Sequence, residues 1–127
     1  MKAPDAWRPG GPGWPALFAA LDRRDADAFA AFLTVDGELR VGNSPPVVGR
    51  RAVRAAAAAF FGTIGGCRHL LIHSWQGPGN AACEGEVSYT RLDGHRVTVP
   101  FVNVFTLQGG EISSYRVFID NAPLQAR

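Results

Sequence analysis

Hydrophobic spacing along the chain changes near residue 65, and this change divides the sequence into a helical part and a strand part. Over 15–34 and 50–65, apolar residues recur every three or four positions, which predicts helices. Beyond that point apolar and polar residues alternate, which predicts strands over 67–76, 81–91, 95–107 and 111–120. The turn sequences "GPGN", "LDG" and "QGG" separate these strands, so we expect an antiparallel meander.

Residues with strong positional preferences refine the helical part. Pro15 suits a first helical turn. Asp25 suits an N-cap, so the stretch from Pro15 is predicted to form two short helices that meet near Arg24. The pair "GG" at 65–66 is expected to end the third helix.

The order of elements predicts the fold class. Between the helices, "DG" at 36–37 predicts a turn before a short strand over 38–43. Helices grouped before an antiparallel sheet predict an α+β fold in which the sheet curls around them. We expect an irregular N-terminal arm over 1–14, whose two tryptophans fold back, and a single domain over 15–127.

The composition and charge of the chain argue against several classes of protein. The 127 residues are 46% apolar and 19% charged, which is typical of one globular domain. No apolar run reaches the roughly 18 residues of a membrane helix, and the start lacks the apolar segment of a secretory signal, so we expect a cytoplasmic protein. The net charge is +2, and "GRRAVR" at 49–54 has no interleaved aromatics, so no nucleic-acid partner is expected. Cys67 and Cys83 form no CxxC motif and are expected to be reduced thiols.

The stretches "LDRRDADAFAAFLTVDGELRVGNSPPVVGRRAV", "VSYTRLDGHRVTVPFVNVFTLQGGEISSYRVFID" and "NAPL" resemble the nuclear transport factor two-like superfamily, and most closely its SnoaL-like branch. The resemblance covers roughly residues 15–124. It implies a cone-shaped, curved antiparallel sheet wrapped around about three N-terminal helices and enclosing a pocket. Members include polyketide cyclases, ketosteroid isomerases, epoxide hydrolases and proteins with no known reaction, so the fold does not give the activity.

Asn103, in "TVPFVNVF", stands out because an unpaired buried amide costs about 1–3 kcal/mol. Ketosteroid isomerases carry an oxyanion-stabilising carboxyl in a "P-x-D-x-F" stretch, and aligning its Phe with Phe105 places that carboxyl at Asn103. Strand alternation then implies that one set of side chains lines the pocket: Phe101, Asn103, Phe105, Tyr115, Val117, Tyr89 and Val87. On 67–76, the same alternation places His69, Leu71, His73 and Trp75 together.

Ketosteroid isomerase chemistry fits this chain poorly. The Tyr of the first helix that donates to the substrate corresponds to Leu17 here. The base at the end of the first strand has Asn43 as its nearest polar candidate, and an amide takes no proton at neutral pH. Asn103 retains a hydrogen-bond donor, so it and Asn43 are expected to bind a ligand rather than exchange protons with it.

Epoxide hydrolases of the superfamily use two carboxylates around an Arg and a water. Arg91 and Asp93 have a suggestive spacing, but Asp93 precedes Gly94 in a predicted turn and suits a hairpin role better. The second carboxylate corresponds to Val117, which carries no charge.

A cyclase needs one acid or base in an apolar pocket. The candidates are His73, Asp120 and Tyr115, with Tyr89 as a further polar lining residue. Each has a structural alternative: a half-exposed strand histidine, a cap of the turn into "NAPL", and core tyrosines with satisfied hydroxyls. His69 and His73 lack a third ligand placed with them, so no metal or other cofactor is expected.

Three classes of function remain open. The first is a cofactor-free cyclase, isomerase or lyase acting on a small hydrophobic carbonyl or polyketide-like molecule. The second is a binding protein without chemistry, in which Asn103, Asn43 and the tyrosines orient a ligand. The third is a scaffold whose cavity is packed shut by Phe18, Phe60, Phe101 and Trp75. The apolar outer face of the sheet, with Val102, Val104 and Phe118, predicts a homodimer in all three.

Overall fold

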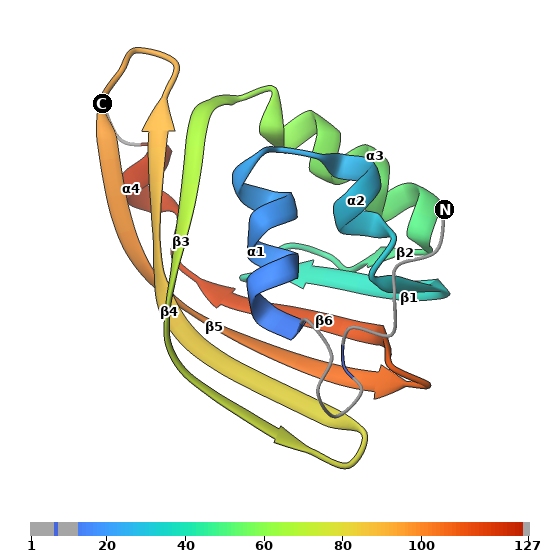
Figure 1. Ribbon diagram of the computed structural model, residues 1–127. Coiled ribbons are helices and arrows are strands. Elements are labelled where there is room, and N and C mark those ends of the chain that lie inside the picture. Colours follow the sequence, from blue (N-terminus) through green and yellow to red (C-terminus); the bar gives the residue numbers. More distant parts are fainter. Residues whose placement is uncertain (1–6, 8–12, 126–127) are drawn as a thin grey trace.

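The computed structural model describes Trp7 and residues 13–125, and within them a curved six-stranded sheet wraps around helices (Figure 1). The elements follow one another as α1 (Gly13–Asp22), α2 (Ala26–Ala30), β1 (Leu33–Val41), β2 (Val47–Val48), α3 (Arg50–Phe61), β3 (Ile64–Gly77), β4 (Asn80–Arg91), β5 (Arg96–Gln108), β6 (Glu111–Ile119) and α4 (Ala122–Gln125). Helices α1, α2 and α3 lie on the concave side of the sheet (Figure 1). The expected α+β class is confirmed.

The sheet has the strand order β2-β1-β6-β5-β4-β3. Strands β3 to β6 pair antiparallel with their neighbours in sequence, as the turn signals predict. One pairing differs from the expectation of an antiparallel sheet, because β1 runs parallel to β6. Parallel neighbours need a long crossover, and the chain between β1 and β6, which includes α3 and the meander, supplies it.

The first two helices meet where the sequence predicts. Asp25 caps α2, and its carboxylate accepts a hydrogen bond from the Ala28 backbone nitrogen at 3.0 Å. Arg24 turns the chain between the helices with φ of 56°. Helix α1 begins at Gly13, two residues before the expected Pro15, so Trp14 belongs to the helix and not to the arm. None of the described helices is long and apolar enough to cross a membrane.

Two glycine-containing pairs that were expected to form a turn and a helix end lie inside strands instead. The "DG" at 36–37 lies inside β1, where the register with β6 shifts between Leu33 and Glu38. A Cβ at Gly37 would lie 2.9 Å from the Ile112 carbonyl oxygen, so the glycine permits this close approach and makes no free turn. The "GG" at 65–66 belongs to β3, since α3 already ends at Phe61.

Aromatic side chains close the core beside the first turn of α1. Trp7 is 3% exposed, and its ring lies 4.6 Å from that of Trp14 and 5.2 Å from that of Phe105. The Gln76 side chain donates a hydrogen bond to the Trp7 carbonyl oxygen at 2.7 Å. Both tryptophans therefore fold back onto the domain as expected, while residues 1–6 and 8–12 of the expected arm lie outside the described residues.

The two faces of β5 have the predicted characters. Phe101, Asn103 and Phe105 are buried on the concave side. Val102 on the opposite face is 38% exposed, and Phe118, its partner in β6, is 47% exposed. The convex face of the sheet thus carries apolar side chains that no described residue covers.

Candidate functional site

A cavity of about 220 Å³ lies between the helices and the concave face of the sheet. Its walls are mostly apolar, with contributions from α1, α2, α3 and all six strands of the sheet. It reaches exposed residues of the β1–β2 connection at Ser44 and Pro45. The polar groups on its walls are few: Cys67, His69, Tyr89, Asn103 and Tyr115 besides Ser44. An apolar cavity with a few converging polar groups is the usual form of a small-molecule site.

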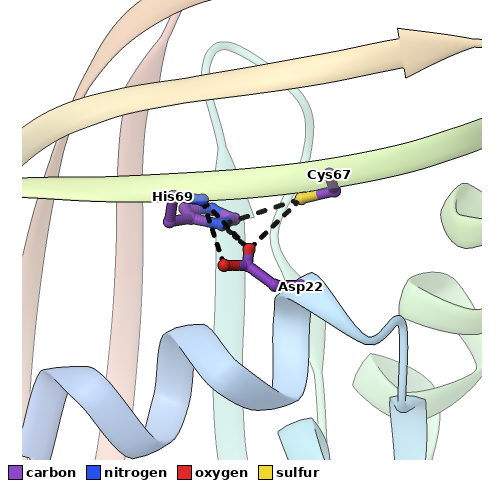
Figure 2. Close-up of side chains that lie close together, drawn as sticks. All are labelled: Asp22, Cys67 and His69. Carbon is purple, nitrogen blue, oxygen red and sulfur yellow. Dashed lines mark hydrogen bonds and ion pairs between the residues drawn. The ribbon is translucent and has the colours of Figure 1, made fainter.

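His69 on β3 and Asp22 at the end of α1 form a close pair (Figure 2). The Asp22 Oδ1 atom lies 2.7 Å from His69 Nδ1. The same carboxylate accepts a hydrogen bond from the His69 backbone nitrogen, at 3.0 Å to Oδ1 and 3.2 Å to Oδ2. The His69 side chain is only 12% exposed and that of Asp22 is 29% exposed. Asp22 therefore fixes the ring orientation and engages Nδ1, so that Nε2 is the nitrogen outside the pair.

Aromatic rings hold His69 from two sides. The Phe18 ring stacks on the imidazole with centroids 4.9 Å apart and planes inclined by 10°. The Phe101 ring meets it edge-on at 5.5 Å and 74°. Two aromatic walls and a bonded Nδ1 leave the imidazole little freedom to rotate, and preorganisation of this kind is what acid–base groups in active sites require.

Cys67 lies next to this pair, two residues before His69 on β3 (Figure 2). Its Sγ atom is 3.6 Å from His69 Nδ1 and 3.8 Å from Asp22 Oδ1. Burial raises the pKa of Cys67 from 9.0 to about 12, and the neighbouring Asp22 carboxylate acts in the same direction. Cys67 is therefore a protonated thiol at neutral pH and not an activated nucleophile.

Asn103 lies where the sequence predicts, on the cavity wall and 3% exposed. Its neighbour across the sheet is Cys83 on β4. Burial raises the pKa of Cys83 from 9.0 to about 12, although hydrogen bonding to the Asn103 backbone and side chain lowers it. The buried amide thus has the Cys83 thiol as a partner within the protein.

The two tyrosines also line the cavity and are buried. Burial is the main cause that raises the pKa of both Tyr89 and Tyr115 above the ordinary value of 10.0. Their hydroxyls therefore keep the proton at neutral pH and can donate hydrogen bonds, but they make poor bases. Phe101, Val117 and Val87, which were expected on the same face, also line the cavity.

A comparison with family models identifies the domain, because residues 15–115 match the model of the SnoaL-like domain. The chain belongs to the SnoaL-like domain family. No curated protein sequence gives a significant match.

Solved structures share the fold of this SnoaL-like domain at low identity. An NTF2-like protein of unknown function from Burkholderia pseudomallei is 19% identical, with a TM-score of 0.78 over 87% of this chain and 89% of that one. TerC, co-crystallised with polyporic acid, is 19% identical, with a TM-score of 0.76 over 87% and 91%. SalBIII, an epoxide hydrolase/cyclase-like enzyme in pyran ring formation in the polyether salinomycin, is 23% identical, with a TM-score of 0.72 over 82% and 84%.

His73 and Trp75 do not face the cavity, contrary to expectation. The register between β3 and β4 shifts between Leu71 and His73, so strict alternation ends there. His73 then pairs with Glu84 on the outer face, where its Nδ1 lies 2.6 Å from Glu84 Oε1. The His73 side chain is 62% exposed, and Trp75 is 58% exposed. The assignment of His73 as the acid or base, and of Trp75 as a ligand contact, fails because of this bulge.

Three further residues lie apart from the cavity. Asp120 is exposed, and its carboxylate accepts a hydrogen bond from the Ala122 backbone nitrogen at 2.9 Å, so the turn-capping alternative is the observed one. Asn43 is exposed in the turn after β1, in a separate depression with Arg40. Phe105 is fully buried between Trp7 and Tyr115 and closes the core behind the cavity without lining it.

The epoxide hydrolase pair is also outside the cavity. Asp93 lies in the β4–β5 hairpin, accepts a hydrogen bond from the His95 backbone nitrogen at 3.0 Å and pairs with Arg91 at 3.2 Å. The backbone hydrogen bond from His95 is the largest cause that lowers the pKa of Asp93. This carboxylate therefore stabilises the turn, as its position before Gly94 predicts.

Asp22 and the pairing of His69 were missed by sequence reasoning. Alternation places His69 on the same face as Leu71, and that is where it lies, but alternation does not indicate which histidine of the strand has an acid–base partner. The partner, Asp22, is 47 residues away, and helix periodicity carries no signal for a contact between a helix end and a strand. A useful clue is that Asp22 ends a helix, where the helix dipole disfavours a carboxylate without a nearby donor.

Proposed function

We propose that this SnoaL-like domain is a cofactor-free enzyme that moves a proton on a small hydrophobic carbonyl or polyketide-like compound, in a cyclisation, isomerisation or elimination. The observation that carries the proposal is the Asp22–His69 pair on the wall of an apolar cavity. His69 replaces His73 as the proposed acid–base group. A neutral imidazole is suited to this role because one ring nitrogen can accept a proton while the other donates a hydrogen bond.

The pair gives each ring nitrogen a separate role. Nδ1 carries the proton and donates to Asp22, so Nε2 has the lone pair. Nε2 takes a proton from a carbon next to the substrate carbonyl, and the C–H electron pair moves toward the carbonyl oxygen. The Asp22 carboxylate stabilises the imidazolium that forms, in the way the carboxylate of a catalytic triad does. Return of the proton to another atom completes the reaction.

Donors for the developing oxyanion lie on the same concave face of the sheet as His69, on the strands that follow β3 in the sheet. Asn103 offers amide N–H groups, and Tyr89 and Tyr115 offer hydroxyls that keep their protons. Hydrogen bonds to an oxyanion in a cavity of low polarity are worth more than in water, and removal of one such donor costs about 10²–10³ in kcat in other enzymes. This arrangement favours catalysis over simple packing.

Cavity size limits the substrate. An apolar cavity of about 150 Å³ holds benzene, so the 220 Å³ here suits one or two small rings. A longer molecule would extend past Ser44 and Pro45 to the surface. The co-crystallisation of TerC with polyporic acid and the role in pyran ring formation named for SalBIII are consistent with such a substrate class.

Proton exchange tests the proposal without knowledge of the natural substrate. Small aryl and cyclic ketones are incubated with the protein in D₂O, and loss of the α-proton signal is followed by NMR. We expect exchange above background with the wild type, a loss of about 10²–10⁴-fold in His69→Gln, and a smaller loss in Asp22→Asn. His73→Gln is the matched control, because that histidine lies outside the cavity and should leave the rate unchanged.

Binding without exchange would favour the alternative function, a ligand-binding or accessory protein of the same fold. The same ketones are then titrated by NMR chemical-shift changes. If ligands bind in the cavity but no panel member exchanges a proton above background, or if His69→Gln exchanges as fast as the wild type, the enzymatic proposal is wrong.

The outer face of the sheet supports a further part of the proposal, a homodimer. Large apolar side chains are exposed on the neighbouring strands β5 and β6, at Val102 and Phe118, and again on β3 beyond β4, at Leu70, Ile72 and Trp75. Large exposed apolar areas on a soluble protein often mark an interface. A second copy of the chain that packs against this face would cover it without obstructing the cavity, which lies on the other side of the sheet.

A further inference from the structure

The Asp22, Cys67 and His69 side chains form a group of three potential metal ligands (Figure 2). Among the described residues it is the one His/Cys/Asp/Glu group of three or more whose ligand atoms all lie within 4.8 Å of one another. The ligands come from the end of α1 and from alternate residues of β3, so both elements converge on one point. Cys67 and His69 also line the cavity.

Two of the three separations between the ligand atoms are close to those around a zinc ion. Tetrahedral zinc, with Zn–S of about 2.3 Å and Zn–N or Zn–O of about 2.0–2.1 Å, holds its ligand atoms roughly 3.3–3.6 Å apart. Cys67 Sγ lies 3.6 Å from His69 Nδ1 and 3.8 Å from Asp22 Oδ1. The third separation, 2.7 Å between Asp22 Oδ1 and His69 Nδ1, is that of a hydrogen bond and has to lengthen.

The chemistry of the three ligands also suits a borderline-soft divalent ion. Thiolate, imidazole and carboxylate are all established zinc ligands, and zinc with three protein ligands keeps a fourth position open. A thiolate and a carboxylate together carry two negative charges, which balance the charge of the ion.

We propose that Asp22, Cys67 and His69 bind Zn²⁺ or a similar divalent transition-metal ion, with the fourth position open to the cavity. The ion takes the place of the proton shared between Asp22 and His69. Small rotations of the Asp22 carboxylate, which is 29% exposed at the end of its helix, lengthen the contact to Nδ1. Binding releases the thiol proton, whereas the imidazole proton leaves Nδ1 and a proton is taken up at Nε2, so the ring stays neutral.

Metal binding at Nδ1 changes what the imidazole can do. A neutral imidazole coordinated through Nδ1 carries its N–H at Nε2, so Nε2 becomes a donor and loses its lone pair. The metal-bound and the hydrogen-bonded forms are therefore alternative states of the same residue. The metal site itself does not depend on the proposed function; if that function holds, Zn²⁺ inhibits it by removing the base.

Cobalt tests the site directly. The protein is freed of metal with EDTA, kept reduced with a phosphine, and titrated with Co²⁺ alone. We expect one equivalent to bind at micromolar concentration, with a thiolate-to-cobalt charge-transfer absorption and the strong visible bands of tetrahedral Co²⁺. Added Zn²⁺ should displace the cobalt and abolish both signals.

Variants identify the ligands. Cys67→Ser should lose the charge-transfer band, and His69→Gln and Asp22→Asn should each weaken binding by at least tenfold. The matched controls are Cys83→Ser and His73→Gln, which change the other cysteine and another histidine and should leave the titration unchanged. Circular dichroism spectra confirm that each variant is folded.

Several outcomes overturn the inference: no stoichiometric binding at micromolar Co²⁺, binding without the charge-transfer band, or a band that persists in Cys67→Ser and vanishes in Cys83→Ser. The first two concern the wild type, so they decide the matter even if a variant fails to fold. Because the titration contains no substrate, its failure leaves the proton-transfer proposal intact, and failure of the proton-exchange assay leaves the metal site intact.

Discussion

Asn103 and Cys83 face each other across β5 and β4, and both side chains are almost completely buried. Asn103 lines the cavity, whereas Cys83 does not. The thiol is a hydrogen-bonding neighbour of the amide. A primary amide has two N–H donors and one oxygen acceptor, so Cys83 does not use its full capacity. The amide therefore retains groups that a ligand in the cavity can reach.

Asn103→Leu separates the two roles of this residue. We expect ligand binding or turnover to be lost, while the thermal midpoint stays the same or rises, because an apolar side chain replaces a buried amide on an apolar wall. Binding is measured by NMR titration with the ketones and stability by thermal denaturation. Cys83→Ala, which removes the neighbour, should keep binding. A large loss of stability with binding intact would assign the amide to the fold.

Gly85→Ala should destabilise the protein strongly. Gly85 faces Leu71 at the β3 bulge, and a Cβ there would lie 2.2 Å from the Leu70 carbonyl oxygen and 3.0 Å from the Phe101 ring. Backbone must therefore move, at a cost of about 1–3 kcal/mol or more in the free energy of unfolding.

The control for this change is Gly62→Ala. Gly62 has a helical φ of −69°, and the nearest atom to a Cβ there is 3.4 Å away. It should be neutral or slightly stabilising, by up to about 1 kcal/mol. Equal urea midpoints for the two variants would contradict the close packing at Gly85.

Phe118→Asp should turn the proposed dimer into a monomer. Phe118 pairs with Val102 on the outer face, and a carboxylate there would have to be buried against the second copy. Light scattering after gel filtration should show the mass of two chains for the wild type and of one for the variant. Leu92→Asp, in the β4–β5 hairpin and 73% exposed when unchanged, is the control and should remain dimeric. A monomeric wild type would contradict the proposed homodimer.

Alkaline pH should destabilise the fold. Burial raises the pKa of Cys83 from 9.0 to about 12 and also raises that of Tyr115. The unfolded chain loses these protons at lower pH than the folded protein, so the unfolded state binds fewer protons and stability falls as pH rises. The free energy of unfolding should be level below pH 9 and decrease between pH 9 and 12.

Urea denaturation at successive pH values measures this slope. Cys83→Ala should make it shallower, because one of the titrating groups is gone. A free energy of unfolding that stays constant or increases above pH 9 would contradict the assigned direction.

Local sequence patterns predicted most of the fold, because the helix cap and the strand alternation that they indicated are present in the structure. Asp25 caps its helix, four strands alternate, and the inward positions of β5 are the expected ones. The parallel partner of β1 was not predictable in this way, because strand alternation is the same for parallel and antiparallel neighbours.

The site was predicted only where alternation continues without interruption. Asn103, Tyr115, Tyr89, Phe101 and Val117 lie on unbroken strands and reach the cavity. His73 and Trp75 follow a bulge, which reverses the direction of every later side chain. Asp22 joins His69 through tertiary packing alone, and no local pattern encodes such a contact.

The bulge opposite Gly85 divides β3 into two parts, and the odd-numbered side chains of these parts point to opposite faces of the sheet. Before the bulge, the odd-numbered side chains face the concave side of the sheet. After it, the odd-numbered side chains face the outer surface. Substitutions in the second half can therefore alter the outer surface while the chemistry around His69 stays unchanged. Gly85 on the neighbouring strand permits this bulge. The inward-facing positions before it and the outward-facing positions after it can therefore change independently during evolution.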